Sequence, residues 1–327
     1  MAKKPYAYAQ LEGVAQEMRK NKDMVFFYEY ETPIATSPTG EVLDLTKEFG
    51  TLRTSGRGWA IDETWLVGSA IGVAAAGSPA IVRIPSMASI FAIEYIYNQA
   101  GKLRSMTGGQ ASMPFVLWQG GGGRSKGSAG QHTEVGQEAL YANLPGVKVV
   151  VPSNAYDAKG LLIASIRDPD PVVYFDYPEV KSGDQPDVPD DAYEVPLGKA
   201  VVRQPGKDLT LVAWAPATVD VKRALPMIAQ AGISVEYIDP RSLKPLDVDT
   251  LVASAKKTGR LLVVEHSHYT NGFGSHVIAE VVQAAPGVKA KKIAFPDVPG
   301  PGAQGMMSWL RPDAPKILDA ARQLMKV

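Results

Sequence analysis

The sequence predicts an α/β protein of two domains, each with a parallel sheet between two layers of helices. Short apolar runs alternate with helical patterns along both halves of the chain, which is typical of parallel sheets covered on both faces. The chain has 327 residues, more than one small domain needs. Residues 181–196 are rich in Asp, Pro and Gly and interrupt the alternation. We therefore expect a domain at 1–185, a linker at 186–198 and a domain at 199–327.

Strands of the first half are recognised as apolar runs of four or five residues bounded by turn-forming residues. They are expected at 24–28, 80–84, 114–118, 147–151 and 172–175. Helical patterns separate them, at 63–76, 89–103 and 155–166. The last helix should end before Asp168, because prolines at 169 and 171 prevent its continuation.

The second half repeats the alternation. Its strands are expected at 208–213, 234–238, 260–264 and 291–294. Its helices are expected at 219–231, 249–258, 275–285 and 315–325. This series predicts a second α/β domain.

Composition excludes several classes of protein. The 34 basic and 34 acidic residues give a net charge of zero, so no basic surface indicates nucleic-acid or membrane binding. The absence of cysteine excludes disulfides and thiolate metal sites. No signal-peptide pattern and no apolar run of membrane-spanning length is evident, and we expect a cytoplasmic protein.

Two segments place polar side chains where a ligand could meet them. Glu63 opens a helix of small residues, ETWLVGSAIG, at 63–72. His132 lies in GQHTE at 130–134, after a glycine-rich approach and before LPGVKVVVPS at 144–153 and DAKGLL at 157–162. Taken alone, an acid in a first helical turn is usually exposed and favoured by the helix dipole. A lone histidine is likewise usually structural, although histidine is the natural group for moving protons at neutral pH.

Together these segments make the chain, from about residue 20 to its end, resemble the beta subunits of thiamine-diphosphate-dependent 2-oxoacid and acetoin dehydrogenases, in the transketolase superfamily. The resemblance implies a transketolase-like pyrimidine-binding domain followed by a transketolase C-terminal domain. It also implies that Glu63 binds N1′ of the cofactor's aminopyrimidine, that Glu29 joins it in a proton relay, and that His132 lies in the substrate channel. Two nearby carboxyls of this kind would share protons.

The chain departs from the family at the position that stacks on the pyrimidine. The usual aromatic residues around 86–88 are missing, which leaves Met87 or Phe91 as substitutes. Trp118 and Arg83 also stand where the family usually carries an arginine and an acid. These departures bear on the substrate more than on the cofactor chemistry.

Members of the superfamily hold the diphosphate through Mg²⁺ with a Gly-Asp-Gly motif, and this chain has none. The resemblance therefore implies that an alpha subunit holds Mg²⁺ and the diphosphate, that thiamine diphosphate is shared, and that the enzyme is an α2β2 assembly active only with its alpha chain. A lipoyl acyltransferase component would receive the acyl group from a small-molecule substrate. The alternatives are a two-chain transketolase-type enzyme that passes the unit to an aldehyde, and a non-catalytic paralogue that stabilises a partner.

Some family members hold a potassium ion with backbone carbonyls that map to Ser165, Asp168 and Asp170. An ordinary helix end is the alternative. The glycine-rich run at 120–128 is not a phosphate loop, because its order is Lys-Gly-Ser rather than Gly-Lys-Ser. His266 and His268 form only a weak metal-binding pattern, since no third ligand is evident.

Overall fold

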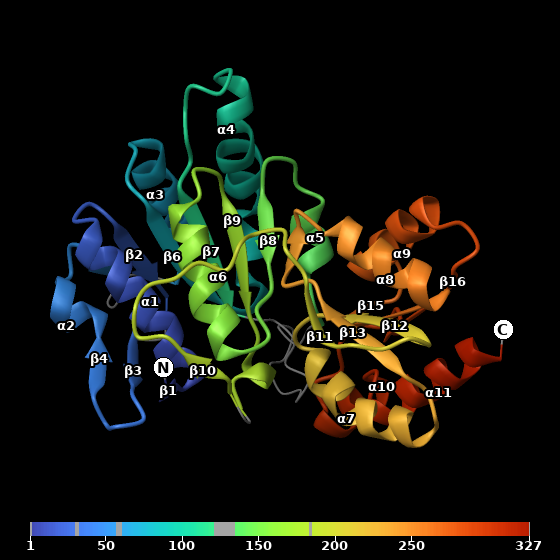
Figure 1. The fold of residues 1–327 in the computed structure, drawn as a ribbon. Helices are drawn as coiled ribbons and strands as arrows, with labels where there is room; N and C mark the ends of the chain where they lie inside the picture. Colours follow the sequence, from blue (N-terminus) through green and yellow to red (C-terminus); the bar gives the residue numbers. More distant parts are fainter. Residues whose placement is uncertain (1, 30–32, 57–60, 121–134, 183–184, 327) are drawn as a thin grey trace. The chain divides into compact units, whose positions relative to one another are not determined.

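The computed structural model describes residues 2–29, 33–56, 61–120, 135–182 and 185–326, which form two compact α/β units (Figure 1). The first unit comprises Met1–Gly121 and Leu140–Leu197, and the second comprises Gly122–Ala139 and Gly198–Val327. Sheets alternating with helices in both units confirm the predicted fold class.

Six strands of the first unit lie side by side, all parallel, in the order β8-β9-β7-β6-β2-β5. Their bounds are β2 (Val25–Tyr28), β5 (Thr54–Ser55), β6 (Ala80–Pro85), β7 (Phe115–Gly120), β8 (Lys148–Val150) and β9 (Val172–Asp176). The sequence did not predict β5, because two residues are too few to show a periodic pattern. Since the strands are parallel, the residues that follow their carboxyl ends gather at one edge of the sheet.

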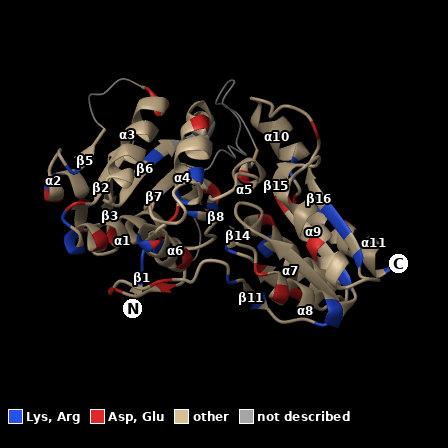
Figure 2. Cartoon of the chain, turned by 90° about the horizontal axis from the view of Figure 1, so that it is seen from above, with Lys and Arg blue, Asp and Glu red and all other residues tan. Residues whose placement is uncertain are grey.

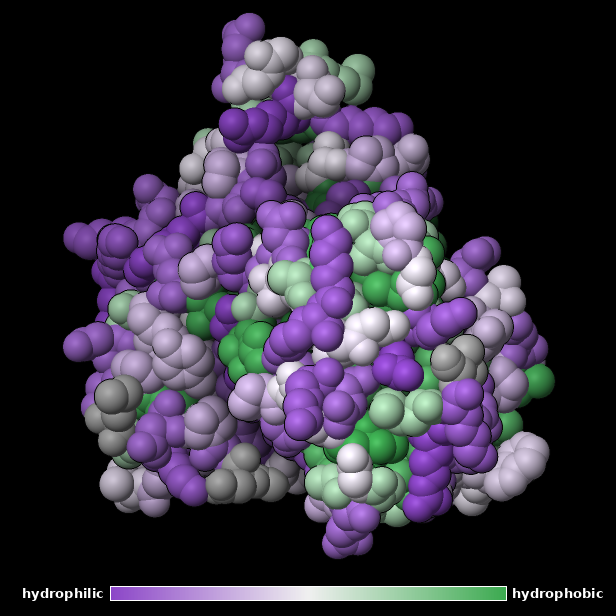
Figure 3. Space-filling view, turned by 45° about the vertical axis from the view of Figure 1, so that its right-hand side comes forward, coloured by the Kyte–Doolittle hydropathy of each residue, from purple (hydrophilic) through white to green (hydrophobic). Residues whose placement is uncertain are grey.

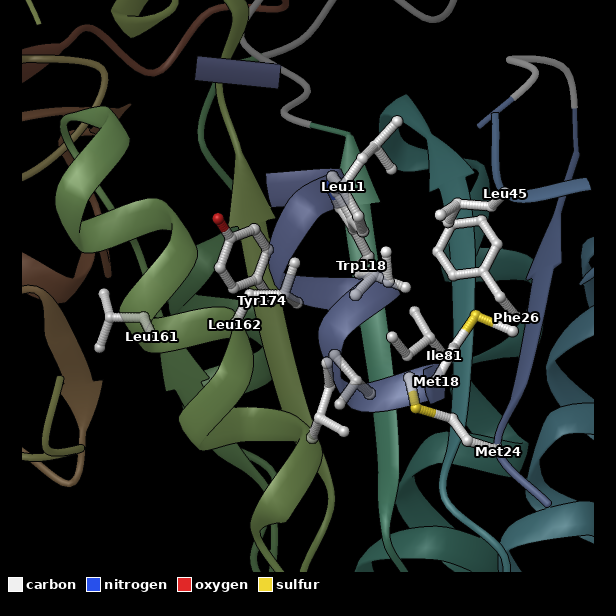
Figure 4. Close-up of a cluster of buried hydrophobic side chains, with 14 of the residues drawn as sticks. Leu11, Met18, Met24, Phe26, Leu45, Ile81, Trp118, Leu161, Leu162 and Tyr174 are labelled. Carbon is white, nitrogen blue, oxygen red and sulfur yellow. The ribbon is translucent and has the colours of Figure 1, made fainter. Parts of the chain in front are cut away.

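Helices α1 (Tyr6–Lys20) and α6 (Ala155–Arg167) cover one face of this sheet. Figure 4 shows the core between these helices and the sheet, where side chains of Phe26, Ile81 and Trp118 meet apolar side chains of both helices. Alternate strand residues therefore point to the opposite face, where α3 (Glu63–Ala75) packs on β2, β6 and β7. As predicted, α6 ends at Arg167, directly before Asp168.

The helix expected at 89–103 is replaced by three short pieces. They are the 3₁₀ helix η1 (Ser86–Ala92), the π-helical η2 (Tyr95–Ala100) and α4 (Gly101–Met106). An apolar pattern does not fix the hydrogen-bond register of a helix, and packing decides it here. A Cβ on Gly101 would lie 2.7 Å from the Pro145 carbonyl oxygen, so the chain is pressed against a neighbouring turn at this junction.

The second unit has a five-stranded sheet in the order β11-β13-β12-β15-β16. The strands are β11 (Val201–Gln204), β12 (Leu209–Ala213), β13 (Val235–Asp239), β15 (Arg260–His268) and β16 (Lys289–Phe295). All pairs are parallel except β11 with β13, which corrects the expectation of a wholly parallel sheet. An antiparallel edge strand needs no crossover helix, and none precedes β11.

Helices α7 (Thr218–Gln230) and α11 (Ala314–Met325) share a core with one face of the second sheet. Helices α8 (Val248–Thr258) and α9 (Phe273–Ala284) pack against its strands and each other. Smaller elements complete the two units: β1 (Ala2–Lys3), β3 (Ile34–Thr36), β4 (Val42–Asp44), α2 (Leu45–Phe49), α5 (Glu138–Ala142), η4 (Pro178–Val180), β10 (Asp187–Val188), β14 (Ser242–Lys244) and α10 (Gln304–Leu310).

Acidic and basic residues are interspersed over both units (Figure 2). Hydrophilic residues cover most of the face in Figure 3, and hydrophobic residues emerge between them in small groups. Among the described residues, no helix is both long and apolar enough to cross a membrane.

Candidate active site

Two acidic residues meet at the carboxyl edge of the first sheet. Glu29 directly follows β2, and its backbone N–H donates to the Arg83 carbonyl oxygen at 3.3 Å. Glu63 is the first residue of α3, whose start is fixed by Asp62, since that carboxylate accepts a hydrogen bond from the Trp65 N–H at 2.9 Å. Tyr28 points toward α1, so Glu29 points to the face that α3 covers. Strand and helix thus bring the two acids together.

The Glu29 carboxyl is in an unusual electrostatic environment. Burial, and after it the neighbouring charge of Glu63, raise the pKa of Glu29 from 4.5 to about 7. Both Glu29 oxygens are buried, and no donor among the described residues forms a regular hydrogen bond with them. The neighbouring charged group that acts on the Glu29 carboxyl is the carboxyl of Glu63, and the raised pKa lets Glu29 exchange a proton near neutral pH.

A carboxyl group with a pKa near 7 can do chemistry that a surface acid cannot. It can donate a hydrogen bond to a ring nitrogen. It can also transfer the proton and take it back near neutral pH. Its position at the carboxyl edge of a parallel sheet is where α/β proteins usually bind ligands.

Of the two residues expected to stack on the cofactor, Phe91 lies near the start of α3. Phe91, on η1, is 65% exposed, and its carbonyl oxygen lies 3.5 Å from the Thr64 hydroxyl, next to Glu63. The side chain of Met87 lies outside the described part of the structure. Phe91 is thus the described candidate with an apolar surface near the start of α3.

A buried polar network that sequence reasoning missed lies on the same sheet. The Ser89 hydroxyl is 2.6 Å from the Gln119 side-chain oxygen and 2.6 Å from the Tyr141 hydroxyl. All three side chains are buried. The one sequence signal was Gln119, a polar residue directly after the apolar run 115–118.

A second missed residue, Asp176, ends β9 and is buried. It accepts a hydrogen bond from the Trp118 ring nitrogen at 3.1 Å and pairs with Lys181 at 2.9 Å. The Arg83 guanidinium lies 4.7 Å from the centre of the Trp118 ring and 4.0 Å from Asp176. Trp118 and Arg83, the two departures noted in the sequence, therefore form one cluster around this acid.

His132 lies outside the described residues. Description of the chain resumes at Val135, in a segment whose backbone is bound to β15 of the second unit. The place of His132 in the substrate channel stays a prediction.

The three residues expected to offer carbonyls to potassium lie where α6 ends. The Ser165 carbonyl oxygen accepts the Asp168 N–H at 3.4 Å. The side chains of Asp168 and Asp170 pair with the Lys148 ammonium at 2.7 and 3.4 Å. The potassium site remains a prediction. Within the described ranges, no group of three or more His, Asp or Glu side chains could hold a metal ion.

The sequence of the chain is similar to known families and proteins. The transketolase pyrimidine binding domain matches residues 12–178, and the transketolase C-terminal domain matches residues 198–317. The pyruvate dehydrogenase E1 component subunit beta of Acholeplasma laidlawii is 36% identical over 280 residues, covering 84% of this chain and 83% of that protein. The chain belongs to the family of pyruvate and acetoin dehydrogenase beta subunits. The Glu29–Glu63 pair lies in its pyrimidine-binding domain.

Other members of this beta-subunit family align over similar lengths. The beta subunit of acetoin:2,6-dichlorophenolindophenol oxidoreductase from Cupriavidus necator is 37% identical and covers 81% of this chain and 79% of that protein. The pyruvate dehydrogenase E1 component subunit beta of Staphylococcus aureus is 31% identical over the full length of both chains. Among solved structures, a split gene transketolase in an inactive beta4 tetramer has a TM-score of 0.77, covers 98% of this chain and 97% of that chain, and is 23% identical, which supports the fold.

Proposed function

We propose that this chain is the beta subunit of a thiamine-diphosphate-dependent dehydrogenase that cleaves a 2-oxoacid or acetoin. The observation that supports this most directly is the Glu29–Glu63 pair, with the Glu29 pKa raised to about 7. A proton-holding carboxyl pair at a sheet edge of the pyrimidine-binding domain fits the nitrogen-rich face of an aminopyrimidine.

The roles of the two acids follow from their positions. Glu63, at the start of α3, would donate a hydrogen bond to N1′ of the aminopyrimidine, and Glu29 would exchange the proton with Glu63 from its partly buried position directly after β2. Phe91 would supply an apolar surface against the pyrimidine ring, with Met87 as the other candidate. When bound, thiamine diphosphate supplies the nucleophilic carbon that adds to the substrate carbonyl.

His132 would meet the substrate rather than the pyrimidine. An imidazole can hold a carboxylate or ketone oxygen and move a proton at neutral pH. In this proposal the pyrimidine-binding domain spans 1–185, the linker 186–198 and the C-terminal domain 199–327.

The chain would work only with an alpha subunit, in an α2β2 enzyme, because it lacks a Gly-Asp-Gly motif for a Mg²⁺-bound diphosphate. A lipoyl acyltransferase component would accept the acyl group. The named relatives are E1 beta and acetoin oxidoreductase beta subunits, which supports this assembly.

The exchange of the cofactor's C2 proton in the assembled enzyme tests the proposal. Glu63→Gln keeps the side-chain volume but removes the exchangeable proton. We expect the C2–H/D exchange rate to fall by about 10²–10⁴, the usual worth of general acid–base help. Glu41→Gln, at an exposed position of the same unit, is the matched control. Wild-type exchange in Glu63→Gln would remove Glu63 from the mechanism and favour a non-catalytic paralogue.

A further inference from the structure

Gly136, four residues after His132 in the sequence, is bound to the carboxyl end of β15. The Gly136 N–H donates to the His266 carbonyl oxygen at 2.6 Å, and the Ser267 hydroxyl donates to the Gly136 carbonyl oxygen at 3.1 Å. A side chain at 136 would clash, since its Cβ would lie 2.8 Å from the His266 oxygen. Both the N–H and the carbonyl oxygen of Gly136 are therefore hydrogen-bonded to consecutive residues of β15.

The side chain of Val135, directly before Gly136, is also fixed. Val135 is 4% exposed and packs in a small cluster with Phe295, at the end of β16, and Met307, on α10. The His266 ring meets the Phe295 ring edge to face, with centres 5.5 Å apart and planes at 89°. The imidazole thus supports the apolar surface on which Val135 packs.

His266 is itself held in a cluster of charged side chains around the buried carboxylate of Asp220. Its Nε2 lies 3.2 Å from the Asp220 carboxylate, on α7, and both side chains are 3% exposed. Arg311, which follows α10, lies 3.4 Å from the same carboxylate, and Arg223 lies 3.7 Å from it. Burying an acid at this depth is costly unless opposite charge accompanies it. The cluster therefore joins α7, β15 and the end of α10 around one imidazole.

His268, by contrast, belongs to a separate environment. Its Nδ1 lies 3.1 Å from the Pro296 carbonyl oxygen, and the described residues offer no metal-binding group around either histidine. Through its contacts, His266 supports the segment that begins at Val135.

We propose that His266 is a positioning residue for the segment that begins at Val135: paired with Asp220, which Arg311 also contacts, it fixes Val135 and Gly136, three and four residues after His132. The expected effect of His266 on turnover rests on the proposed function, in which His132 meets the substrate. The expected effect of His266 on the position of Gly136 does not depend on that function. Misplacing a reacting group by about 1 Å can cost about 10²-fold in rate. Loss of the imidazole should therefore slow the substrate step without affecting the Glu29–Glu63 chemistry.

The test compares His266→Ala, His266→Gln and His276→Ala in the enzyme assembled with its alpha subunit. His276, on α9, is a matched histidine of the same unit whose side chain is 53% exposed. Hydrogen exchange of the peptide 135–142 should be about tenfold faster in His266→Ala than in wild type. It should be unchanged in His276→Ala and largely restored in His266→Gln, whose amide can still reach Asp220.

Turnover is measured with pyruvate and with acetoin, using 2,6-dichlorophenolindophenol as electron acceptor. In His266→Ala we expect kcat to fall about tenfold or more, while cofactor C2–H/D exchange stays within about twofold of wild type. Wild-type protection of 135–142 in His266→Ala overturns the inference, as does an equal loss of turnover and C2–H/D exchange. If the wild-type enzyme turns over neither substrate, the proposed function fails on substrate, and the hydrogen-exchange comparison still decides the role of His266.

Discussion

Replacing Glu29 by Gln should change how the stability of the protein depends on pH. The folded chain holds the Glu29 proton more tightly than the unfolded chain, since the pKa of Glu29 is raised from 4.5 to about 7. For an acid shifted in this direction, the folded state is favoured below the unfolded pKa. That stabilisation is lost as pH rises through the folded pKa. Wild type should therefore lose stability between about pH 4.5 and 7, and Glu29→Gln should lack this contribution.

The size of the effect follows from the environment of the side chain. At full coupling a rise from 4.5 to about 7 corresponds to about 3 kcal/mol. Glu29 is only partly buried, so solvent screening should reduce this to about 1–2 kcal/mol. Glu63→Gln removes the neighbouring charge but leaves the burial of Glu29, so its effect should lie between those of wild type and Glu29→Gln.

The assay is urea unfolding of wild type and Glu29→Gln at several values between pH 5 and 8.5. Taking the difference between the two proteins cancels the titration of the groups that do not interact with Glu29. The free energy of unfolding of Glu29→Gln relative to wild type should rise by about 1–2 kcal/mol across this range. Parallel pH curves for the two proteins would refute the raised pKa and the carboxyl pair. Glu41→Gln, at an exposed position, should track wild type at every pH.

Three further predictions concern the rest of the proposed enzyme. The isolated chain should bind thiamine diphosphate poorly, and calorimetry should show saturable, Mg²⁺-dependent binding only after the alpha subunit is added; tight binding by this chain alone would contradict the two-chain assignment. His132→Ala should spare C2–H/D exchange and lower kcat for the substrate by about 10²-fold or more, whereas equal loss of both steps would make His132 structural. A potassium ion on the carbonyls of Ser165, Asp168 and Asp170 should raise the melting temperature of the assembled enzyme in potassium relative to a bulky organic cation at equal ionic strength, and identical melting temperatures would leave an ordinary helix end.

Much of the candidate site could be located from the sequence because local signals marked it. Glu63 was identifiable as a helix start, and the structure adds that the neighbouring Asp62 caps that helix. Glu29 was identifiable as an acid at the end of an apolar strand. Their meeting could not be derived from spacing, because it depends on β2 lying beside β6 and on α3 packing over that face.

Other features depended on contacts between distant segments. The sequence analysis did not single out Asp176, and the pairing of β9 with β7 brings it to Trp118. His266 looked like half of a weak metal-binding pair. Its partners lie on α7 and after α10, 46 and 45 residues away along the chain.

The sequence by itself determined the alternation of strands and helices, the end of α6 at Arg167 and the family of the chain. Each of these rests on short-range periodicity, on backbone restrictions imposed by proline, or on motifs of contiguous residues. Only the tertiary structure decided that β11 runs antiparallel, that the helix expected at 89–103 divides into three pieces, and that Glu29 shares its surroundings with Glu63. These outcomes depend on which surfaces pack together and on how far a carboxyl is removed from water, and neither is encoded in any local stretch of residues.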